Sequence, residues 1–354
     1  MAQLYLVTGA AGHLGLTVVQ ALVRRGETVR ALVLPNDPAT QNVPKAAQVF
    51  EGDVRDPQTL LAAFAVAPGD RLTVIHCAGI VTIESRYVQS VYDVNVTGTK
   101  NIVDACVARR VRKLVYVSSV HAVPILPKGE VIREVSEFSP ETVTSLYAQT
   151  KAEATAYVLK AVRERGLNAS VVHPSGISGP GDYGNNHMTQ LVRDWSDGRL
   201  TAGIRGGYDF VDVRDVADGI LACCERGRSG ECYFLTNRYV TVQEIFDILC
   251  ALRGRKRMRT FLPLWFIKLT APLAEQYYRL LRQKPLFTRY SVFTLESNAI
   301  FSHEKATREL HYQPRAFEDT LRDTLLWCES IGLVKPARKQ RSSCARQRPC
   351  RSAR

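Results

Sequence analysis

Thr8-Gly9-Ala10-Ala11-Gly12-His13-Leu14-Gly15 joins an apolar, β-branched run (Leu4–Thr8) to a segment with helical spacing (Leu14–Arg24). Glycines at these positions let the backbone turn tightly, approach a pyrophosphate closely and pack the helix on the sheet. The start of the helix offers free N–H groups and the positive end of its dipole to the anion. This strand–loop–helix unit predicts a dinucleotide-binding fold. The loop residues expected to line the dinucleotide are Thr8, Gly9, Gly12, His13, Leu14 and Gly15, with His13 packing beside the loop rather than catalysing.

Two hydrophobic periods alternate along the N-terminal half of the chain. Short β-branched runs predict strands at Leu4–Thr8, Thr28–Leu34, Val49–Glu51, Leu72–Cys77, Leu114–Ser118 and Ala169–His173. Helical spacing lies between them, at Leu14–Arg24, Gln58–Ala67, Val91–Arg109 and Tyr147–Arg165. Near-continuous apolar strands separated by helices predict a parallel sheet covered on both faces. The expected fold class is therefore α/β, with a doubly wound Rossmann domain.

The pattern changes after His173, where glycine and proline interrupt Pro174–Asp182. Helices are expected at His187–Trp195, Asp215–Cys224, Val242–Leu252 and 317–330, and a strand at Tyr208–Val213. We expect three regions: a nucleotide-binding domain (1–173), a smaller, partly helical substrate lobe (174–334) and a basic, disordered tail (335–354). Residues 208–235 are expected to return to the first domain, with Tyr208–Gly219 at the edge of its sheet.

The net charge of +13 on 354 residues is concentrated at the C-terminus. From Lys335 onward there are eight basic residues and no acid, which leaves an ordinary charge on the rest of the chain. A basic tail can form weak contacts with an anionic surface, but a solvated extension without a partner is the simpler interpretation. Nothing in the charge pattern predicts a specific nucleic-acid partner.

Cysteine spacing and hydropathy place further bounds on the class of protein. The nine cysteines form no CxxC pair and no cluster with histidine at zinc spacing, so neither a metal site nor a disulfide framework is predicted. Buried thiols suit a reducing cytosol, and a cytoplasmic location is expected. The most apolar stretch, Phe261–Leu273, has about a dozen residues and carries Lys268, whereas a membrane-spanning helix needs roughly 20. We therefore expect no transmembrane segment.

The end of the second predicted strand leaves the cofactor open between NAD and NADP. An acid about 20 residues after the loop usually binds the adenosine ribose of NAD, whereas a base suits the phosphate of NADP. Val33 and Leu34 are neither, and Arg30 and Asp37 favour opposite forms.

Tyr147 and Lys151 lie four residues apart at the start of a predicted helix and so share one face. The charge of the lysine favours the phenolate and lowers the tyrosine pKa, which makes Tyr147 a usable acid or base. Ser118 and Ser119 follow the fifth strand, at the sheet edge where open α/β folds bind ligands. A serine hydroxyl there can hold a substrate oxygen while Tyr147 moves its proton.

Seven motifs along the chain resemble, in order, those of the extended short-chain dehydrogenase/reductases, also called the NAD-dependent epimerase/dehydratase family. They are Thr8–Gly15, Gly52–Asp56, His76–Gly79, Asn95–Thr99, Ser118–Ser119, Tyr147–Lys151 and Ser178–Asp182. The resemblance covers about residues 3–330. It implies a Rossmann fold, an enzyme with bound NAD or NADP, and a homodimer formed through Val91–Arg109 and Tyr147–Arg165.

The resemblance also implies roles for single residues. Ser119 would orient the substrate, Tyr147 would be the acid/base, and Lys151 would bind the nicotinamide ribose and tune Tyr147. Asn95 resembles the helix asparagine of the proton relay, although a buried structural amide is an equal interpretation. The residues implied at the cofactor are Asp53 and Val54 at the adenine, Cys77, Ala78 and Gly79 at the ribose and pyrophosphate, and Pro174 and Ser175 beside the nicotinamide.

Two functions fit this family. Sugar-nucleotide epimerases and dehydratases typically carry an asparagine that contacts the substrate diphosphate, at a position that here is Gly176. The Pro174–Ile177 sequence is closer to the dihydroflavonol reductase and hydroxysteroid dehydrogenase branches. The apolar run Phe261–Leu269 could cover a hydrophobic substrate, although packing in the protein core is the default interpretation. We therefore favour an NAD(P)-dependent oxidoreductase acting on the alcohol/ketone pair of an apolar small molecule, with a sugar-nucleotide epimerase or dehydratase as the alternative. His173 stands where the family usually has arginine.

Overall fold

The computed structural model of the chain describes residues 2–82, 87–200, 202–263 and 295–336. A seven-stranded parallel sheet in the order β10-β6-β5-β4-β1-β2-β3 forms the first domain. Its strands are β1 (Gln3–Thr8), β2 (Thr28–Val33), β3 (Gln48–Glu51), β4 (Arg71–His76), β5 (Lys113–Val117), β6 (Ala169–Pro174) and β10 (Cys232–Leu235). This confirms the predicted α/β Rossmann architecture, because the strand order reverses between β1 and β4.

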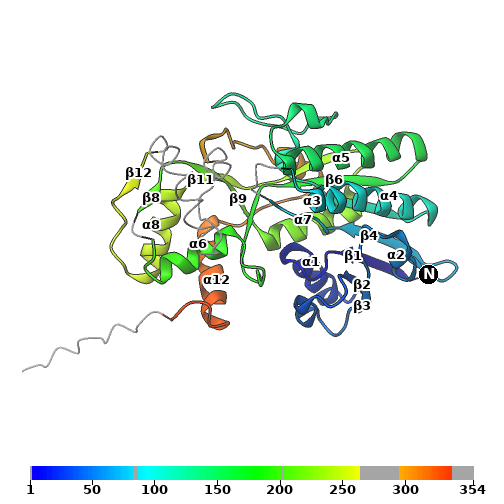
Figure 1. Cartoon of the computed structure of the whole chain (residues 1–354), viewed down its shortest axis with the longest axis horizontal. Coiled ribbons are helices and arrows are strands. Elements are labelled where there is room, and N and C mark those ends of the chain that lie inside the picture. Colours follow the sequence, from blue (N-terminus) through cyan, green and yellow to red (C-terminus); the bar gives the residue numbers. More distant parts are fainter. Residues whose placement is uncertain (1, 83–86, 201, 264–294, 337–354) are drawn as a thin grey trace, which may run out of the picture.

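Helices cover both faces of this sheet, as Figure 1 shows. Successive side chains of a strand point to opposite faces, so Tyr5 and Val7 pack on one side and Leu4 and Leu6 on the other. The first side is covered by α1 (His13–Arg24) and α7 (Val213–Arg226). On the second side lie α2 (Pro57–Phe64), α3 (Gln89–Tyr92), α4 (Thr99–Ala108) and α5 (Leu146–Arg165). The homodimer expected through the α3–α4 segment and α5 stays a prediction.

A second group of elements forms the lobe after β6, seen at the left of Figure 1. A three-stranded sheet joins β7 (Gly176–Ser178), β9 (Gly207–Asp212) and β11 (Arg238–Thr241), and a pair joins β8 (Gly203–Ile204) to β12 (Phe261–Leu262). Helices α6 (His187–Ser196), α8 (Val242–Arg253) and α12 (Phe317–Ser330) enclose a separate apolar core, and α11 (Glu304–Leu310) packs near α7. None of the described helices is long and apolar enough to cross a membrane.

One topological expectation is wrong in part. Tyr208–Gly219 was expected at the edge of the main sheet, but β9 pairs with β7 and β11 instead. The edge strand is β10, which pairs with β6, so within 208–235 the part that packs on the first domain is α7 and β10, whereas 208–212 belong to the sheet of the lobe. Most of the apolar run 261–269 and of the tail 335–354 lies outside the described residues.

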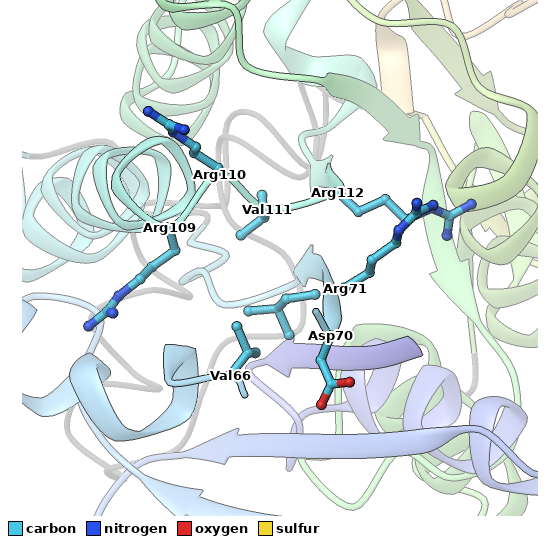
Figure 2. A pocket seen from close by; sticks show the side chains of 8 residues that line it. Val66, Asp70, Arg71, Arg109, Arg110, Val111 and Arg112 are labelled. Carbon is cyan, nitrogen blue, oxygen red and sulfur yellow. The ribbon is translucent and has the colours of Figure 1, made fainter. Parts of the chain in front are cut away.

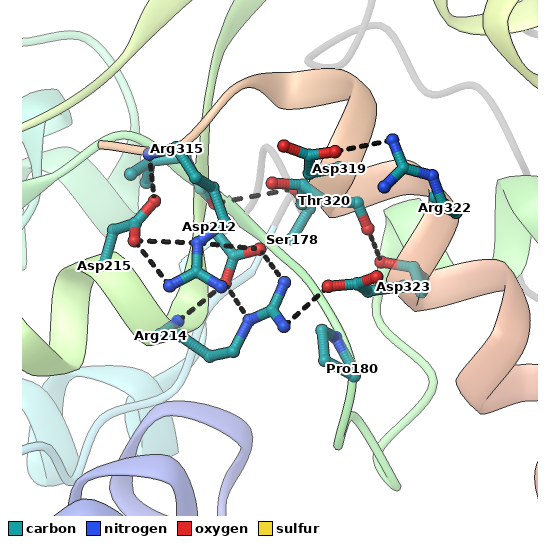
Figure 3. Close-up of polar contacts among 12 residues, drawn as sticks. Ser178, Pro180, Asp212, Arg214, Asp215, Arg315, Asp319, Thr320, Arg322 and Asp323 are labelled. Carbon is teal, nitrogen blue, oxygen red and sulfur yellow. Dashed lines mark hydrogen bonds and ion pairs between the residues drawn. The ribbon is translucent and has the colours of Figure 1, made fainter. Parts of the chain in front are cut away.

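A cluster of ion pairs fastens the lobe to the start of α7 (Figure 3). Asp212, which is fully buried, accepts two hydrogen bonds from the Arg214 guanidinium, and Arg214 also reaches Asp323 of α12 at 2.7 Å. Burial alone would raise the pKa of Asp212, but the bonds from Arg214 outweigh it and lower the pKa. Gly179 packs directly against Asp212, and the neighbouring Pro180 carbonyl contacts His13 of α1. The cluster therefore positions the 178–182 loop over the phosphate loop.

Asp212→Asn should lower the free energy of unfolding by about 2 kcal/mol, because the buried carboxylate loses its charge-assisted hydrogen bonds with Arg214, which keeps only Asp323 as a counter-charge. The matched control is Asp319→Asn, since Asp319 pairs with Arg322 in an exposed position; its effect should be below about 1 kcal/mol. Urea unfolding followed by circular dichroism measures both. Equal effects of the two substitutions would contradict a structural role for the buried cluster.

Candidate active site

The phosphate loop has the close packing that a dinucleotide site requires. Gly9 has a φ of +65°, and a Cβ there would lie 2.8 Å from the Cα of Ala78. A Cβ on Gly15 would collide with the Gly9 carbonyl oxygen, so the start of α1 lies directly on the loop. Gly12 is the N-cap of α1, no side chain caps the helix and no acid lies in its first turn. The N–H groups at this helix start therefore suit a pyrophosphate, which fits an NAD(P) cofactor.

His13 lies between the phosphate loop and the lobe. Its Nε2 is 3.1 Å from the Pro180 carbonyl oxygen and its Nδ1 is 3.3 Å from the side-chain nitrogen of Asn186. Burial lowers the pKa of His13, which favours the neutral ring. These contacts favour the packing role expected for His13 over a catalytic one. Its predicted contact with the cofactor stays a prediction.

A chain of buried hydrogen bonds links β1 to the helix that carries Asn95. The Ala78 N–H donates to Thr8 Oγ1, and Thr8 Oγ1 is 2.7 Å from Nδ1 of His76. On the other side of the ring, Nε2 is 3.1 Å from Thr99 Oγ1, which donates to the Asn95 carbonyl oxygen at 2.6 Å. Because Thr99 uses its proton on that carbonyl, Nε2 of His76 must donate and Nδ1 must accept from Thr8. One tautomer satisfies every bond.

Asn95 lies in a π-helical turn, Asp93–Gly98, between α3 and α4. Such turns occur frequently at functional sites. The Asn95 side chain accepts from Ile80 N at 2.7 Å and donates to Ile80 O at 3.0 Å and to Thr150 Oγ1 at 3.2 Å. Its polar groups are therefore engaged with protein atoms, which supports the interpretation as a structural amide at least as well as that of a relay group.

Gly79 leaves a small space between Asn95 and Lys151. A Cβ at Gly79 would lie 3.2 Å from Asn95 Oδ1 and 3.4 Å from Lys151 Nζ. The absence of a side chain there fits a cofactor ribose beside Lys151. Neighbouring Cys77 is an inert thiol, because burial raises its pKa to about 12.

The two serines after β5 have different surroundings. Thr155 Oγ1 donates to the Lys151 carbonyl oxygen, so Ser118, 2.7 Å away, must donate to Thr155. Ser118 is thus used in packing α5 on the sheet. Ser119 begins a short 3₁₀ turn (Val120–Ala122), and its Oγ accepts from His121 N at 3.2 Å. This difference supports Ser119 as the functional serine.

His173 fixes the backbone of Ser119, a role that the sequence did not reveal. Its Nδ1 is 2.9 Å from the Ser119 carbonyl oxygen and must donate, because a carbonyl only accepts. The ring stacks on Phe138, with centroids 5.3 Å apart and planes 6° apart. Burial lowers the pKa of His173 to about 4, so the ring is neutral near pH 7. The imidazole that stands in place of the usual arginine therefore positions the serine without adding a charge.

Tyr147 and Lys151 are both buried on the first turns of α5. Lys151 Nζ donates to the Val117 carbonyl oxygen at 2.8 Å and lies 5.0 Å from the Tyr116 ring. Burial lowers the pKa of Lys151 to about 8. The ring of His121 lies 5.9 Å from that of Tyr147, edge to face, and burial lowers the pKa of this histidine to about 4. Tyr147 thus has an ammonium and a neutral imidazole nearby.

The residues predicted near the adenosine end of the cofactor contact groups close by in the protein. Asp53 forms an ion pair with Arg55 at 2.6 Å, and the hydrogen bond from Arg55 lowers its pKa. Val54 is buried against Gly98. Arg30 donates to the carbonyl oxygens of Ala63 and Ala65 at the end of α2, and Asp37 caps a 3₁₀ turn through the N–H of Ala39. Neither Arg30 nor Asp37 decides between NAD and NADP.

Pro174 ends β6 and Ser175 follows it, with a buried acid beside Ser175. Ser175 Oγ donates to Asp209 Oδ1 at 2.5 Å, and Asn237 N donates to the same oxygen at 3.1 Å. Burial raises the pKa of Asp209 to about 6. No sequence motif indicates Asp209, because it becomes a neighbour of Ser175 only through the pairing of β7 with β9.

The family is decided by comparison with known proteins. A sequence model of the NAD dependent epimerase/dehydratase family matches residues 5–235. The chain belongs to this family. It is therefore an NAD(P)-dependent enzyme of the extended short-chain dehydrogenase/reductases, as the motifs predicted. Among the described residues, no group of histidine, cysteine, aspartate and glutamate side chains could hold a metal ion.

Two curated relatives and one solved structure illustrate the range of this family. Sterol demethylase protein B of Methylococcus capsulatus is 32% identical over 336 residues, covering 93% of this chain and 99% of the relative. A 4-hydroxy-2-methyl-3-oxo-4-farnesyl-3,4-dihydroquinoline-1-oxide ketoreductase of Stigmatella aurantiaca is 29% identical, covering 87% and 91%. UDP-glucuronic acid 4-epimerase from Bacillus cereus, solved with NAD, shares the fold with a TM-score of 0.71 at 18% identity, covering 93% and 99%.

The buried histidines predict that acid destabilises this fold. Burial lowers the pKa of His76 to about 3 and those of His121 and His173 to about 4. The unfolded chain binds protons near pH 6.5, well before the folded protein does, so the free energy of unfolding falls as pH decreases from about 6.5 to about 4. The expected slope is about 1.4 kcal/mol per pH unit for each histidine, measured by urea unfolding across this range.

His121→Gln should reduce the pH dependence of the free energy of unfolding by the contribution of one histidine, about 1.4 kcal/mol per pH unit. His311→Gln is the control, because His311 is exposed at the end of α11. A slope unchanged by His121→Gln, or reduced equally by His311→Gln, would show that buried histidines do not carry the pH dependence.

Proposed function

We propose that the enzyme is an NAD(P)-dependent oxidoreductase that interconverts a secondary alcohol and a ketone of a fairly apolar small molecule. The observation that carries this choice is the packing of Gly176. A Cβ there would lie 2.8 Å from Cδ1 of Phe210 and 3.0 Å from the Asp209 carbonyl oxygen. No side chain at this position can reach a substrate diphosphate without moving β9, which argues against a sugar-nucleotide substrate.

Each buried side chain of the site has a defined task in this proposal. The bound nicotinamide would supply or accept the hydride at C4. Ser119, oriented by the N–H of His121, donates a hydrogen bond from its hydroxyl to the substrate oxygen and keeps its proton. Tyr147 gives that oxygen a proton in the reducing direction and removes it in the oxidising direction. Lys151, held by the Val117 carbonyl oxygen, favours the phenolate form of Tyr147 through its charge.

Aromatic side chains beside Ser119 favour an apolar substrate. Tyr208 stacks on His121 with ring centroids 5.6 Å apart, and Phe210 follows two residues later on β9. Val120 and Val123, on either side of His121, belong to the same apolar cluster. The names of two relatives, a sterol demethylase protein and a ketoreductase for a farnesyl-bearing quinoline oxide, agree with a bulky apolar substrate.

Tyr147→Phe should lower kcat by about 10²- to 10⁴-fold, the usual contribution of a positioned acid or base. Cofactor affinity, measured by fluorescence titration with NADH and NADPH, should change little, because only the phenolic oxygen is lost. Tyr157→Phe is the matched control on the same helix, since Tyr157 OH donates to Asp104 at the surface. Oxidation of NAD(P)H with a panel of apolar ketones measures turnover.

Unchanged turnover in Tyr147→Phe would remove Tyr147 from the mechanism. If the unaltered enzyme oxidised no NAD(P)H with any ketone but converted a UDP- or dTDP-sugar, the alternative function, a sugar-nucleotide epimerase or dehydratase, would replace the proposal.

A further inference from the structure

A hollow lies at the edge of the main sheet opposite the candidate active site. It has a volume of about 270 Å³ and lies where β4 and β5 begin and α4 ends. The active-site residues, in contrast, follow the carboxyl ends of the same strands. The residues that line it are Val66, Asp70, Arg71, Leu72, Arg109, Arg110, Val111 and Arg112 (Figure 2). We refer to it as the arginine hollow.

The charges around the arginine hollow are unbalanced. It has four arginines and one acid, Asp70, whose carboxylate accepts a hydrogen bond from Ala2 N at 2.9 Å. Within the described ranges, none of the four guanidinium groups forms an ion pair. Arginines elsewhere on this edge do pair: Arg165 with Asp104 and Arg228 with Glu309. The hollow therefore presents more cationic groups than acidic ones, and none of its arginines is ion-paired within the described residues.

Arg112 and Arg71 are the most informative of the four. Nη1 of Arg112 is buried and has no hydrogen-bond partner among the described residues, although a buried guanidinium nitrogen ordinarily has an acceptor. Figure 2 shows the guanidinium groups of Arg71 and Arg112 extending in the same direction, close to each other, whereas those of Arg109 and Arg110 point away from this pair. Two like charges held close together repel each other. An anion between them would offset this repulsion and supply the hydrogen-bond acceptor that Arg112 lacks.

Arg110 occupies a backbone position that favours glycine. It follows the C-cap of α4, Arg109, and has a φ of +50°, in the left-handed region. Glycine, or sometimes asparagine, usually occupies this position because it avoids the steric cost of a side chain. An arginine nonetheless occupies this strained position beside the hollow. The dipole at the end of α4 would attract Arg109 and Arg110. It does not explain Arg71, which begins β4, or Arg112, which immediately precedes β5.

We propose that the arginine hollow binds a phosphate-bearing anion of the size of phosphate or pyrophosphate, either free or as the headgroup of an anionic lipid. Guanidinium groups bind phosphate oxygens through charge-assisted, often paired hydrogen bonds. The volume of about 270 Å³ is below the range of roughly 300 to 1,000 Å³ of sites for drug-sized ligands, which suits a small anion rather than a second dinucleotide.

Isothermal titration with pyrophosphate tests the site in the full-length enzyme. NAD is kept in excess, so that the phosphate loop is filled. Arg71→Gln and Arg112→Gln should each weaken binding by about tenfold or more, because each removes a charge-assisted contact. Arg71 is exposed, so Arg71→Gln should fold normally. Arg110→Gly should be at least as stable as the unaltered protein, since glycine accepts the positive φ, and should weaken binding less, because the Arg110 guanidinium points away from that pair. Arg163→Gln, an exposed arginine at the end of α5, is the control and should bind normally.

A second arm distinguishes the two sources of phosphate. Flotation with phosphatidylcholine vesicles that contain phosphatidic acid, compared with phosphatidylcholine alone, tests the lipid headgroup. Binding of either probe that depends on Arg71 and Arg112 supports the site. The proposal is overturned if neither pyrophosphate nor phosphatidic acid binds, or if Arg71→Gln and Arg112→Gln bind as tightly as the unaltered protein. Ketone reduction is assayed separately, and this site should not alter it.

Discussion

The imidazole of His76 lies fully buried between Thr8 at the end of β1 and Thr99 in α4, with hydrogen bonds of 2.7 and 3.1 Å. Thr8 belongs to the phosphate loop, and Thr99 bonds the carbonyl of Asn95. One neutral ring therefore couples the strand that leads into the phosphate loop to the helical turn that carries Asn95. The ring must stay neutral, because a charged imidazolium would donate at both nitrogens and could no longer accept the hydrogen bond from the Thr8 hydroxyl. Burial, which lowers the pKa of His76 to about 3, keeps it so.

Around this connection, the sheet brings together side chains that are far apart in the chain. Parallel strands place the ends of β1, β4 and β5 at one edge, so that Gly9, Gly79 and Ser119 lie near one another. Helix α5 then adds Tyr147 and Lys151, with Lys151 bonded to the last carbonyl of β5. The lobe closes over this edge because ion pairs around Asp212 fix the 178–182 loop.

The sequence predicted the parts of this site whose signals are local. The glycine spacing of the phosphate loop and the four-residue spacing of Tyr147 and Lys151 are such signals, and the main strands were found within one or two residues. Other features depend on tertiary pairing. The edge position of β10 could not be predicted, because a short apolar segment contains no signal for the strand with which it pairs. His173 and Asp209 acquire their partners only when β6 lies beside β5 and β7 pairs with β9.

Net hydride transfer between cofactor and substrate is the central claim, and isotope transfer tests it most directly. The enzyme is incubated with an apolar ketone and NADH or NADPH deuterated at C4, and the released alcohol is analysed by mass spectrometry and NMR. We predict that deuterium appears at the carbinol carbon, in proportion to the cofactor oxidised. Conversion of a sugar nucleotide without deuterium in the product, and with no transfer to any ketone, would contradict the proposed function.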